Sequence, residues 1–348
     1  MHASTAYVVN VGWYYEERTT SIASIVALSF PMDAALIFGL GPLYLVAGWL
    51  SGRSVSRHGS LAFLRSRLLR LGLPTVVFLG VIGPAATYLG DRAEGGRQSW
   101  RSLVWPPLRE RDLGPMWFVA ALLAFSVLYA LYRQFRPTPG LARTALTARR
   151  LAAWVVLIGV ADFAVWLRWD YSSGSVWNFN WAHWPQSAGM FLLGAVAYER
   201  GWLDTVPESL ARSARRATLV GLALLSAVAV VSIAAGGDYA VLAGGWHWRT
   251  GVFALLDGLI TVGLAVWVVA AAQRRWNAPL SATLQRAARG SYAAYVFHAV
   301  VLVLISAALR SLPWPPEAKF LGLVLVGVPA CFVVGHLLVR LRFVNRVL

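Results

Sequence analysis

The chain has 348 residues, of which 58% are hydrophobic and only 13% are charged. A soluble domain carries about 25% charged residues, so this composition excludes a soluble globular protein and indicates a polytopic membrane protein. The net charge of +16 does not indicate a nucleic-acid-binding protein, because the basic residues lie between apolar runs and not on one soluble module. The single cysteine, Cys331, excludes an intrachain disulfide.

Apolar stretches alternate with polar or basic connections along the whole chain, which predicts an all-α bundle of membrane-spanning helices. We expect nine spans, at about 34–50, 71–90, 114–132, 151–168, 182–198, 217–235, 250–272, 290–309 and 319–339. A glycine pair in the first of these regions, Gly48 and Gly52, has the small-xxx-small spacing that is typical of close helix packing.

The connection at 51–70 contains five arginines and no acidic residue, which is typical of a cytoplasmic loop. If the spans alternate from there, the cytoplasmic side holds 21 of the 31 basic residues and three of the 15 acidic residues, and the C-terminus is cytoplasmic. Nine spans then leave the start of the chain outside. We therefore expect residues 1–9 to be the outer end of a first helix that this sequence mostly lacks.

Arg67 and Arg70 lie three positions apart at the end of this basic connection. If the segment is helical, the two guanidinium groups share one face and suit the phosphates of a lipid or of a nucleotide-bearing substrate. The alternative is that they only set the topology and contact lipid head groups.

Two groups of polar residues, one at the start of the chain and one near its end, lie in or beside apolar runs. His2 would lie near the outer membrane boundary, where an imidazole can act as a general base near neutral pH, although an ordinary terminal residue is the alternative. Ser291, Tyr295 and His298 are spaced to share one helical face, which predicts cavity lining or hydrogen bonding between helices.

Carboxylates within apolar runs are costly and face a cavity or a partner, and this chain has two, Asp162 and Asp257. Gln186, near the start of another span, is expected to face the bundle. Trp117 opens a span after Gly114-Pro-Met and is expected to anchor at the membrane interface. No cluster of metal-ligand residues is found in the sequence, so we predict no metal site.

Six stretches, taken together and in order, resemble the membrane-bound acyltransferase 3 family, the O-acyltransferases of bacterial surface sugars and antibiotics. They are HASTAY with WYY, PLYLVAGWLSGRS followed by FLRSRLLRLGLP, GPMWFVAALL, HWPQSAGMFLLGAVAYERGWLD, RGSYAAYVFHAVV and RFVNRVL.

The resemblance implies that residues 1–348 form a single transmembrane acyltransferase domain of a ten-helix bundle in the bacterial cell membrane. It implies transfer of an acyl group, expected to be acetyl, from cytosolic acyl-CoA to a hydroxyl of a carbohydrate or another surface or secondary-metabolite acceptor. No cofactor is expected besides acyl-CoA as the donor substrate.

The resemblance also carries roles for individual residues. His2 matches the histidine of the family's first helix, whereas the family's arginine about ten residues earlier would precede Met1. The family's Arg-x-x-Arg falls on Arg67 and Arg70, which would bind acyl-CoA. His298 matches a late histidine with a supporting role. The other expected cavity-lining residues are Tyr295, Ser291, Trp117 and Asp257.

A transporter or flippase of an anionic glycan or lipid is the alternative function. Asp162, Asp257 and His298 would then line a polar pathway through the membrane. Transport of substrate without consumption of acyl-CoA would distinguish this function from acyl transfer.

Overall fold

The computed structural model describes residues 2–7, 12–25, 27, 38–105, 111–136, 143–169, 178–234, 244–276, 279 and 281–347. These residues form helices joined by turns and loops, with no strand among them, which confirms the all-α prediction. The main helices are α1 (His2–Tyr7), α3 (Leu40–His58), α4 (Ser60–Arg67), α5 (Leu73–Val77), α6 (Gly83–Ala93), α7 (Trp100–Val104), α8 (Trp117–Phe135), α9 (Ala148–Trp166), α10 (Trp184–Arg200), α11 (Glu208–Ala234), α13 (Trp248–Arg275), α14 (Ala282–Arg310), α15 (Pro316–Leu338) and α16 (Arg342–Val347).

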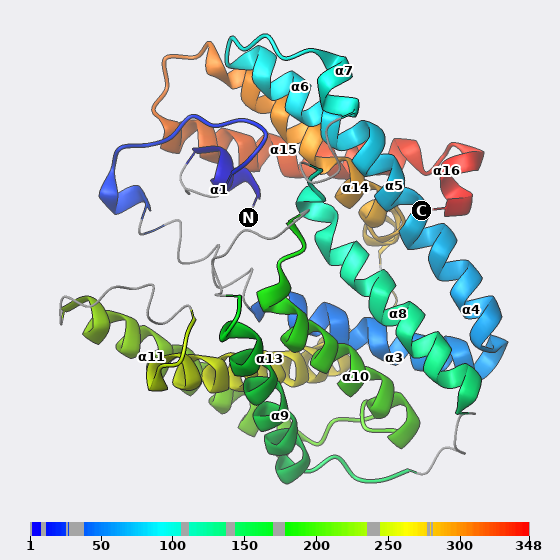
Figure 1. Ribbon diagram of the computed structural model, residues 1–348. Coiled ribbons are helices and arrows are strands. Elements are labelled where there is room, and N and C mark those ends of the chain that lie inside the picture. The colour runs from blue at the N-terminus through cyan, green and yellow to red at the C-terminus, as the bar shows by residue number, and fades with distance from the viewer. Residues whose placement is uncertain are drawn as a thin grey trace.

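The helices lie in two groups (Figure 1). One group contains α3, α9, α10, α11 and α13, and the other contains α1, α6, α14 and α15. Helix α8 packs against α3 of the first group and also against α4, which continues into α6 of the second group. It therefore connects the two groups. Residues far apart in the sequence are thereby brought together, because α1 at the start of the chain lies against α14 and α15 near its end.

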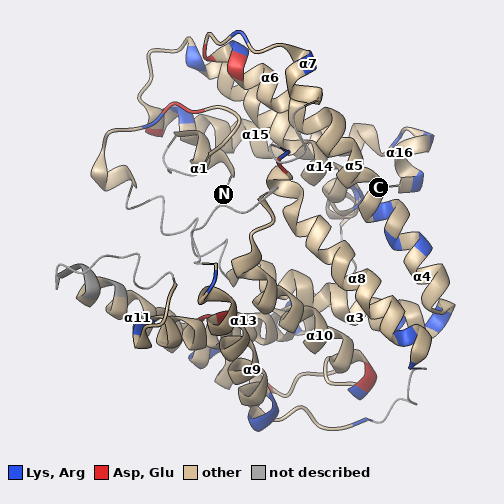
Figure 2. Cartoon of the chain, in the orientation of Figure 1, with Lys and Arg blue, Asp and Glu red and all other residues tan. Residues whose placement is uncertain are grey.

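The basic connection at 51–70 is helical and not an extended loop. Helix α3 continues to His58, and a single residue, Gly59 with a φ of 80°, separates it from α4. Glycine adopts this positive φ readily, so the chain can change direction between α3 and α4 without a longer loop. The arginines of the predicted loop therefore lie on helices, along α4 and the end of α3 (Figure 2).

Helix α4 leads without a break through α5 into α6, over 34 residues from Ser60 to Ala93. Two π-helical turns, η1 (Leu68–Gly72) and η2 (Phe78–Ile82), interrupt its regular geometry. π-helical turns occur often at functional sites. The first turn contains Arg70, and the second contains Leu79, which lines the cavity described below.

Five of the described helical segments are long and apolar enough to cross a membrane. They are Ser60–Ala93, Gly114–Phe135, Trp248–Arg275, Ala282–Arg310 and Pro316–Leu338. They correspond to five of the nine expected spans, and the count of nine stays a prediction. The helices at the other four positions, α3, α9, α10 and α11, are shorter or carry arginines at their ends, and residues 34–37 lie outside the described part.

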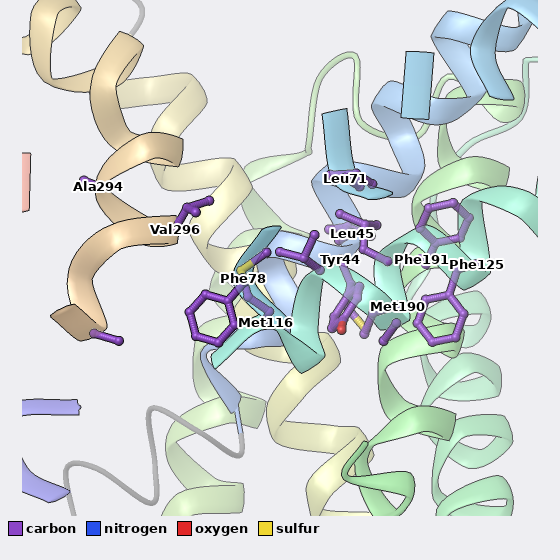
Figure 3. Close-up of a cluster of buried hydrophobic side chains, with 14 of the residues drawn as sticks. Tyr44, Leu45, Leu71, Phe78, Met116, Phe125, Met190, Phe191, Ala294 and Val296 are labelled. Carbon is purple, nitrogen blue, oxygen red and sulfur yellow. The ribbon is translucent and has the colours of Figure 1, made fainter. Parts of the chain in front are cut away.

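The core is built from large apolar side chains where α8 meets α3 and α10. Tyr44, Phe125, Met190 and Phe191 pack together there and are almost completely buried (Figure 3). The packing of α3 on α10 is close, because a Cβ at Gly48 would overlap the carbonyl oxygen of Phe191. The small-residue spacing in α3 therefore serves helix packing, as the sequence predicts.

Candidate functional site

A polar cavity of about 760 Å³ lies at the C-terminal end of α6, beside α1. This volume is within the range of small-molecule binding sites. The cavity lies at the end of the long Ser60–Ala93 helix that is opposite to Arg67 and Arg70. Its polar and aromatic lining residues are His2, Thr5, Trp13, Tyr14, Glu16, Thr87, Asp91, Glu94, Gln98, Ser102, Arg111, Asp112, Trp117, Asn178 and Asn180.

The return of the chain after α1 fixes the position of His2. The backbone N–H of Glu17 donates to Ala6 O at 2.8 Å, and the N–H of Thr19 donates to Tyr7 O at 2.9 Å. The buried ammonium group of Lys319 on α15 donates to the Glu17 carboxylate at 2.6 Å. The segment is thus tied both to α1 and to a helix more than 300 residues later in the sequence, which holds His2 at the cavity wall.

The imidazole of His2 contacts two rings, which also lie within 6.2 Å of each other. The Trp13 ring stacks on it, with centroids 4.7 Å apart and planes 18° apart. The His298 ring lies 4.8 Å away and is tilted by 40°. His298 itself is not among the residues that line the cavity, so His2 is the histidine that a bound molecule would meet first.

The loop that carries Trp13 and Tyr14 is pressed onto α6. A Cβ at Gly90 would overlap the carbonyl oxygen of Tyr14, so only glycine allows this approach. The Tyr14 hydroxyl lies next to Gly114 and has no hydrogen-bond partner among the described residues. Burial, and then the nearby Asp112 carboxylate, raise the pKa of Tyr14, so the phenol remains a neutral donor at physiological pH.

Two carboxylates of the cavity, those of Glu94 and Asp112, hold its loops. Glu94 accepts from the backbone N–H of Glu16 at 2.7 Å, and Asp112 accepts from that of Gly114 at 2.6 Å. Each uses one carboxylate oxygen for this purpose. The second oxygens, the amides of Asn178 and Asn180 and the aromatic rings give the cavity many hydrogen-bonding groups beside flat apolar surfaces.

Arg67 and Arg70 lie away from the cavity, where η1 begins. The Arg67 guanidinium stacks over the Phe63 ring at 5.1 Å, and Arg70 is exposed. The Tyr292 hydroxyl of α14 donates to the backbone carbonyl of Arg70 at 2.9 Å. The backbone at Arg70 is therefore held against α14, the helix that also carries His298.

Three rings on α14 lead from the arginines toward His2. Tyr292 stacks parallel to Tyr295, with centroids 6.5 Å apart, and Tyr295 lies 5.6 Å from His298. Tyr292 and His298 are six residues apart, about 9 Å along the helix axis. The Tyr295 hydroxyl donates to the carbonyl of Pro115, which itself lines the cavity.

Of the predicted polar stripe on α14, Tyr295 hydrogen-bonds to another segment, His298 contacts the ring of His2 but does not line the cavity, and Ser291 does neither. Ser291 is exposed, and its hydroxyl donates to Ala288 O within its own helix. Residues 282–289 of α14 are exposed or half-buried, and Ser291 lies just after them, at the border of the covered part of the helix, so it shares the face without sharing the contacts. Trp117 lines the cavity, where its ring lies 5.8 Å from that of His183.

Asp257 does not line the cavity. It lies in a buried cluster between α9, α10 and α13, where the Gln186 side-chain amide donates to both Asp257 oxygens at 2.9 Å and to Thr261 Oγ1 at 2.7 Å. The backbone N–H of Gln186 donates to Asp162 Oδ1 at 3.0 Å. This cluster lies in the other group of helices, so Asp162, Asp257 and His298 do not form the polar pathway that a transporter would need.

Several residues of the cavity were not singled out from the sequence. Trp13 and Tyr14 look like interface residues, and Asp91, Glu94 and Asp112 look like ordinary loop acids. The juxtaposition of Gly90 with a residue 76 positions earlier has no signal in a single sequence. The WYY stretch at 13–15, which is part of the family resemblance, is the local feature that points to this segment.

Apolar helices long enough to cross a membrane, packed around a polar cavity, define a polytopic membrane protein. A family model described as an acyltransferase domain, acyltransferase 3, matches residues 1–336. The chain therefore belongs to the acyltransferase 3 family, as the sequence motifs indicate, and this membership indicates membrane acyltransferase activity. No curated protein and no solved structure matches the chain significantly.

Proposed function

We propose that this protein transfers an acyl group, in the simplest case acetyl, from acyl-CoA to a hydroxyl of a carbohydrate acceptor bound in the cavity. The observation that carries the proposal is the position of His2, an imidazole on the wall of a cavity that is large enough for a sugar and rich in hydrogen-bonding groups. Acyl transfer to a hydroxyl needs a general base at such a place.

In the proposed reaction His2 accepts the proton of the acceptor hydroxyl while the hydroxyl oxygen attacks the thioester carbonyl carbon. The tetrahedral intermediate then collapses, the carbon–sulfur bond breaks, and the thiolate of coenzyme A leaves. The His2 imidazolium returns its proton to that thiolate. The products are an ester and free coenzyme A, and no covalent acyl-enzyme is needed.

Arg67 and Arg70 are suited to hold the phosphates of coenzyme A at the opposite end of the long helix. Guanidinium groups form paired, charge-assisted hydrogen bonds with phosphate, and the hydrogen bond from Tyr292 to the Arg70 carbonyl anchors the backbone of this segment. The ring series on α14 then gives the direction in which the thioester would extend toward His2. By the positive-inside rule this arginine end and the C-terminus face the cytoplasm.

Carbohydrate is the acceptor class that the lining favours. Asparagine, glutamine and carboxylate side chains bind hydroxyl groups from several directions, and the half-buried Trp13 ring, one face of which stacks on His2, adds an aromatic surface for the apolar side of a sugar ring.

An acyl-transfer assay in liposomes tests the proposal. The purified protein is reconstituted in liposomes with radiolabelled acetyl-CoA, and methyl glycosides of glucose, galactose and rhamnose are supplied as acceptors. We expect ester-linked label on at least one glycoside, with release of an equal amount of coenzyme A. Intact acetyl-CoA and unlabelled glycosides, in liposomes where the protein is folded, would contradict the proposal.

A further inference from the structure

We infer that His298 is a positioning residue that holds the His2 imidazole in the orientation needed for proton transfer. The inference deepens the proposed function and rests on it. It begins from the order of the groups: the cavity, then His2, then His298, then the backbone carbonyl of Tyr295. His298 lies behind His2 and has no access of its own to the cavity.

The hydrogen bond of His298 defines its tautomer. Its Nδ1 lies within hydrogen-bond distance of Tyr295 O. A carbonyl oxygen has no proton to give, so Nδ1 must carry the proton and the neutral ring has its lone pair on Nε2. This Nε2 atom is buried and has no hydrogen-bond partner among the described residues.

The unused Nε2 and the ring of His2 are neighbours. The ring centroids are 4.8 Å apart, and the Trp13 ring, which stacks on one face of His2 at 4.7 Å, also lies 6.2 Å from His298, so the three rings form one cluster and Trp13 limits the tilt of the His2 ring. The two rings are not yet hydrogen-bonded, as is common for catalytic groups before the substrate binds. A small rotation of His2 lets its own ring N–H donate to His298 Nε2.

This hydrogen bond would leave the second ring nitrogen of His2 unprotonated and directed at the cavity. His298 then acts on His2 as a carboxylate or carbonyl acts on the histidine of other acid–base pairs: it selects the tautomer and fixes the ring. Loss of such a partner costs about 10- to 100-fold in activity when it orients a functional histidine.

Two variants of His298 separate this role from simple packing. His298→Leu fills the space without an acceptor, and His298→Gln places a carbonyl oxygen near the position of Nε2. We expect His298→Leu to lower kcat about 10- to 100-fold with unchanged KM for acetyl-CoA, and His298→Gln to recover part of the loss. Equal effects of the two variants, or a change in KM alone, would overturn the inference.

His336→Leu is the matched control, because it makes the same substitution in the neighbouring helix α15 and away from the cavity. We expect it to keep the kcat of the unmodified protein. If transfer depends on His2 and His298→Leu behaves like this control, the inference fails while the proposed function stands.

A spectroscopic measurement decides the inference even if no acyl transfer is found. In protein labelled with ¹⁵N-histidine, the ring nitrogen signals that are lost in His298→Leu report the tautomer of His298. We expect a protonated Nδ1 and a bare Nε2. A proton on Nε2 would make His298 a donor and would overturn the inference, whereas the absence of transfer alone would overturn only the proposed function.

Discussion

Two regions of this molecule place polar groups among apolar helices, and they treat them in opposite ways. In the cluster of α9, α10 and α13, the Gln186 side chain donates to Asp257 and Thr261, and its backbone donates to Asp162. The cluster is buried and lines no part of the cavity, and Asp162 Oδ2 there has no hydrogen-bond partner among the described residues. Around His2 the polar groups surround an open cavity, and the Tyr14 hydroxyl and His298 Nε2 have no partner among the described residues.

The difference shows which polar residues hold helices together and which are available to a ligand. A hydrogen-bonded cluster in an apolar interior stabilises the fold, since each group would cost free energy if left alone. Unpaired donors and acceptors beside a cavity cost free energy, and a bound molecule can offset this cost by forming hydrogen bonds with them. We therefore expect substitutions in the cluster to change stability, and substitutions around the cavity to change activity.

The largest effect on stability is expected for Gln186→Leu. The change removes the side-chain amide that donates to the buried Asp257 carboxyl group and to Thr261, and should lower the free energy of unfolding by about 1–3 kcal/mol, the cost of leaving a buried acceptor unpaired. The unfolding temperature in detergent measures it. Gln98→Leu is the control, because Gln98 is exposed. Equal unfolding temperatures for both variants would show that the cluster does not stabilise the helices.

Arg67→Ala is expected to weaken binding of the donor. Loss of charge-assisted hydrogen bonds to phosphate costs about 1.5–3 kcal/mol, which corresponds to a rise of roughly 10- to 100-fold in KM for acetyl-CoA. Initial rates at varied acetyl-CoA measure this value. Arg65→Ala, at an exposed position two residues earlier on α4, should leave it unchanged. A normal KM for Arg67→Ala would remove the arginine pair from the donor site.

Gly90→Ala is expected to displace the Tyr14 loop and lower kcat about tenfold, a cost of about 1.4 kcal/mol in the transition state. The added methyl group would overlap the carbonyl of Tyr14. Gly80→Ala lies in the same long helix with open space around its Cβ and should keep full activity. If both variants are equally active, the loop does not need its contact with α6.

The smallest effect is expected for Glu94→Gln. The change keeps the size of the side chain and replaces a charged acceptor by a neutral one, so the KM for the glycoside should rise about threefold to tenfold, with about 1 kcal/mol lost. Glu208→Gln is the control at the exposed start of α11. An unchanged KM for Glu94→Gln would show that its free oxygen does not contact the acceptor.

The helical architecture could be predicted from the sequence because apolar runs of membrane length determine it locally. The arginine pair and His2 could be singled out by residue type and position. The contacts between segments that are distant in the sequence could not be predicted in this way. Asp162 and Asp257 are each visible as an intramembrane carboxylate, but their connection through Gln186 depends on how three helices pack. Ser291 shares the helical face of His298, yet periodicity does not tell where along the helix the neighbours end.

The most direct test of the account is a single-turnover measurement on His2→Ala. The protein is first saturated with radiolabelled acetyl-CoA, then mixed with the best glycoside acceptor, so that donor binding does not enter the rate. We predict transfer slower by about 10²- to 10⁴-fold, with an unchanged unfolding temperature and unchanged acetyl-CoA binding. A transfer rate equal to that of the unmodified protein would contradict the assignment of the cavity at His2 as the site of acyl transfer.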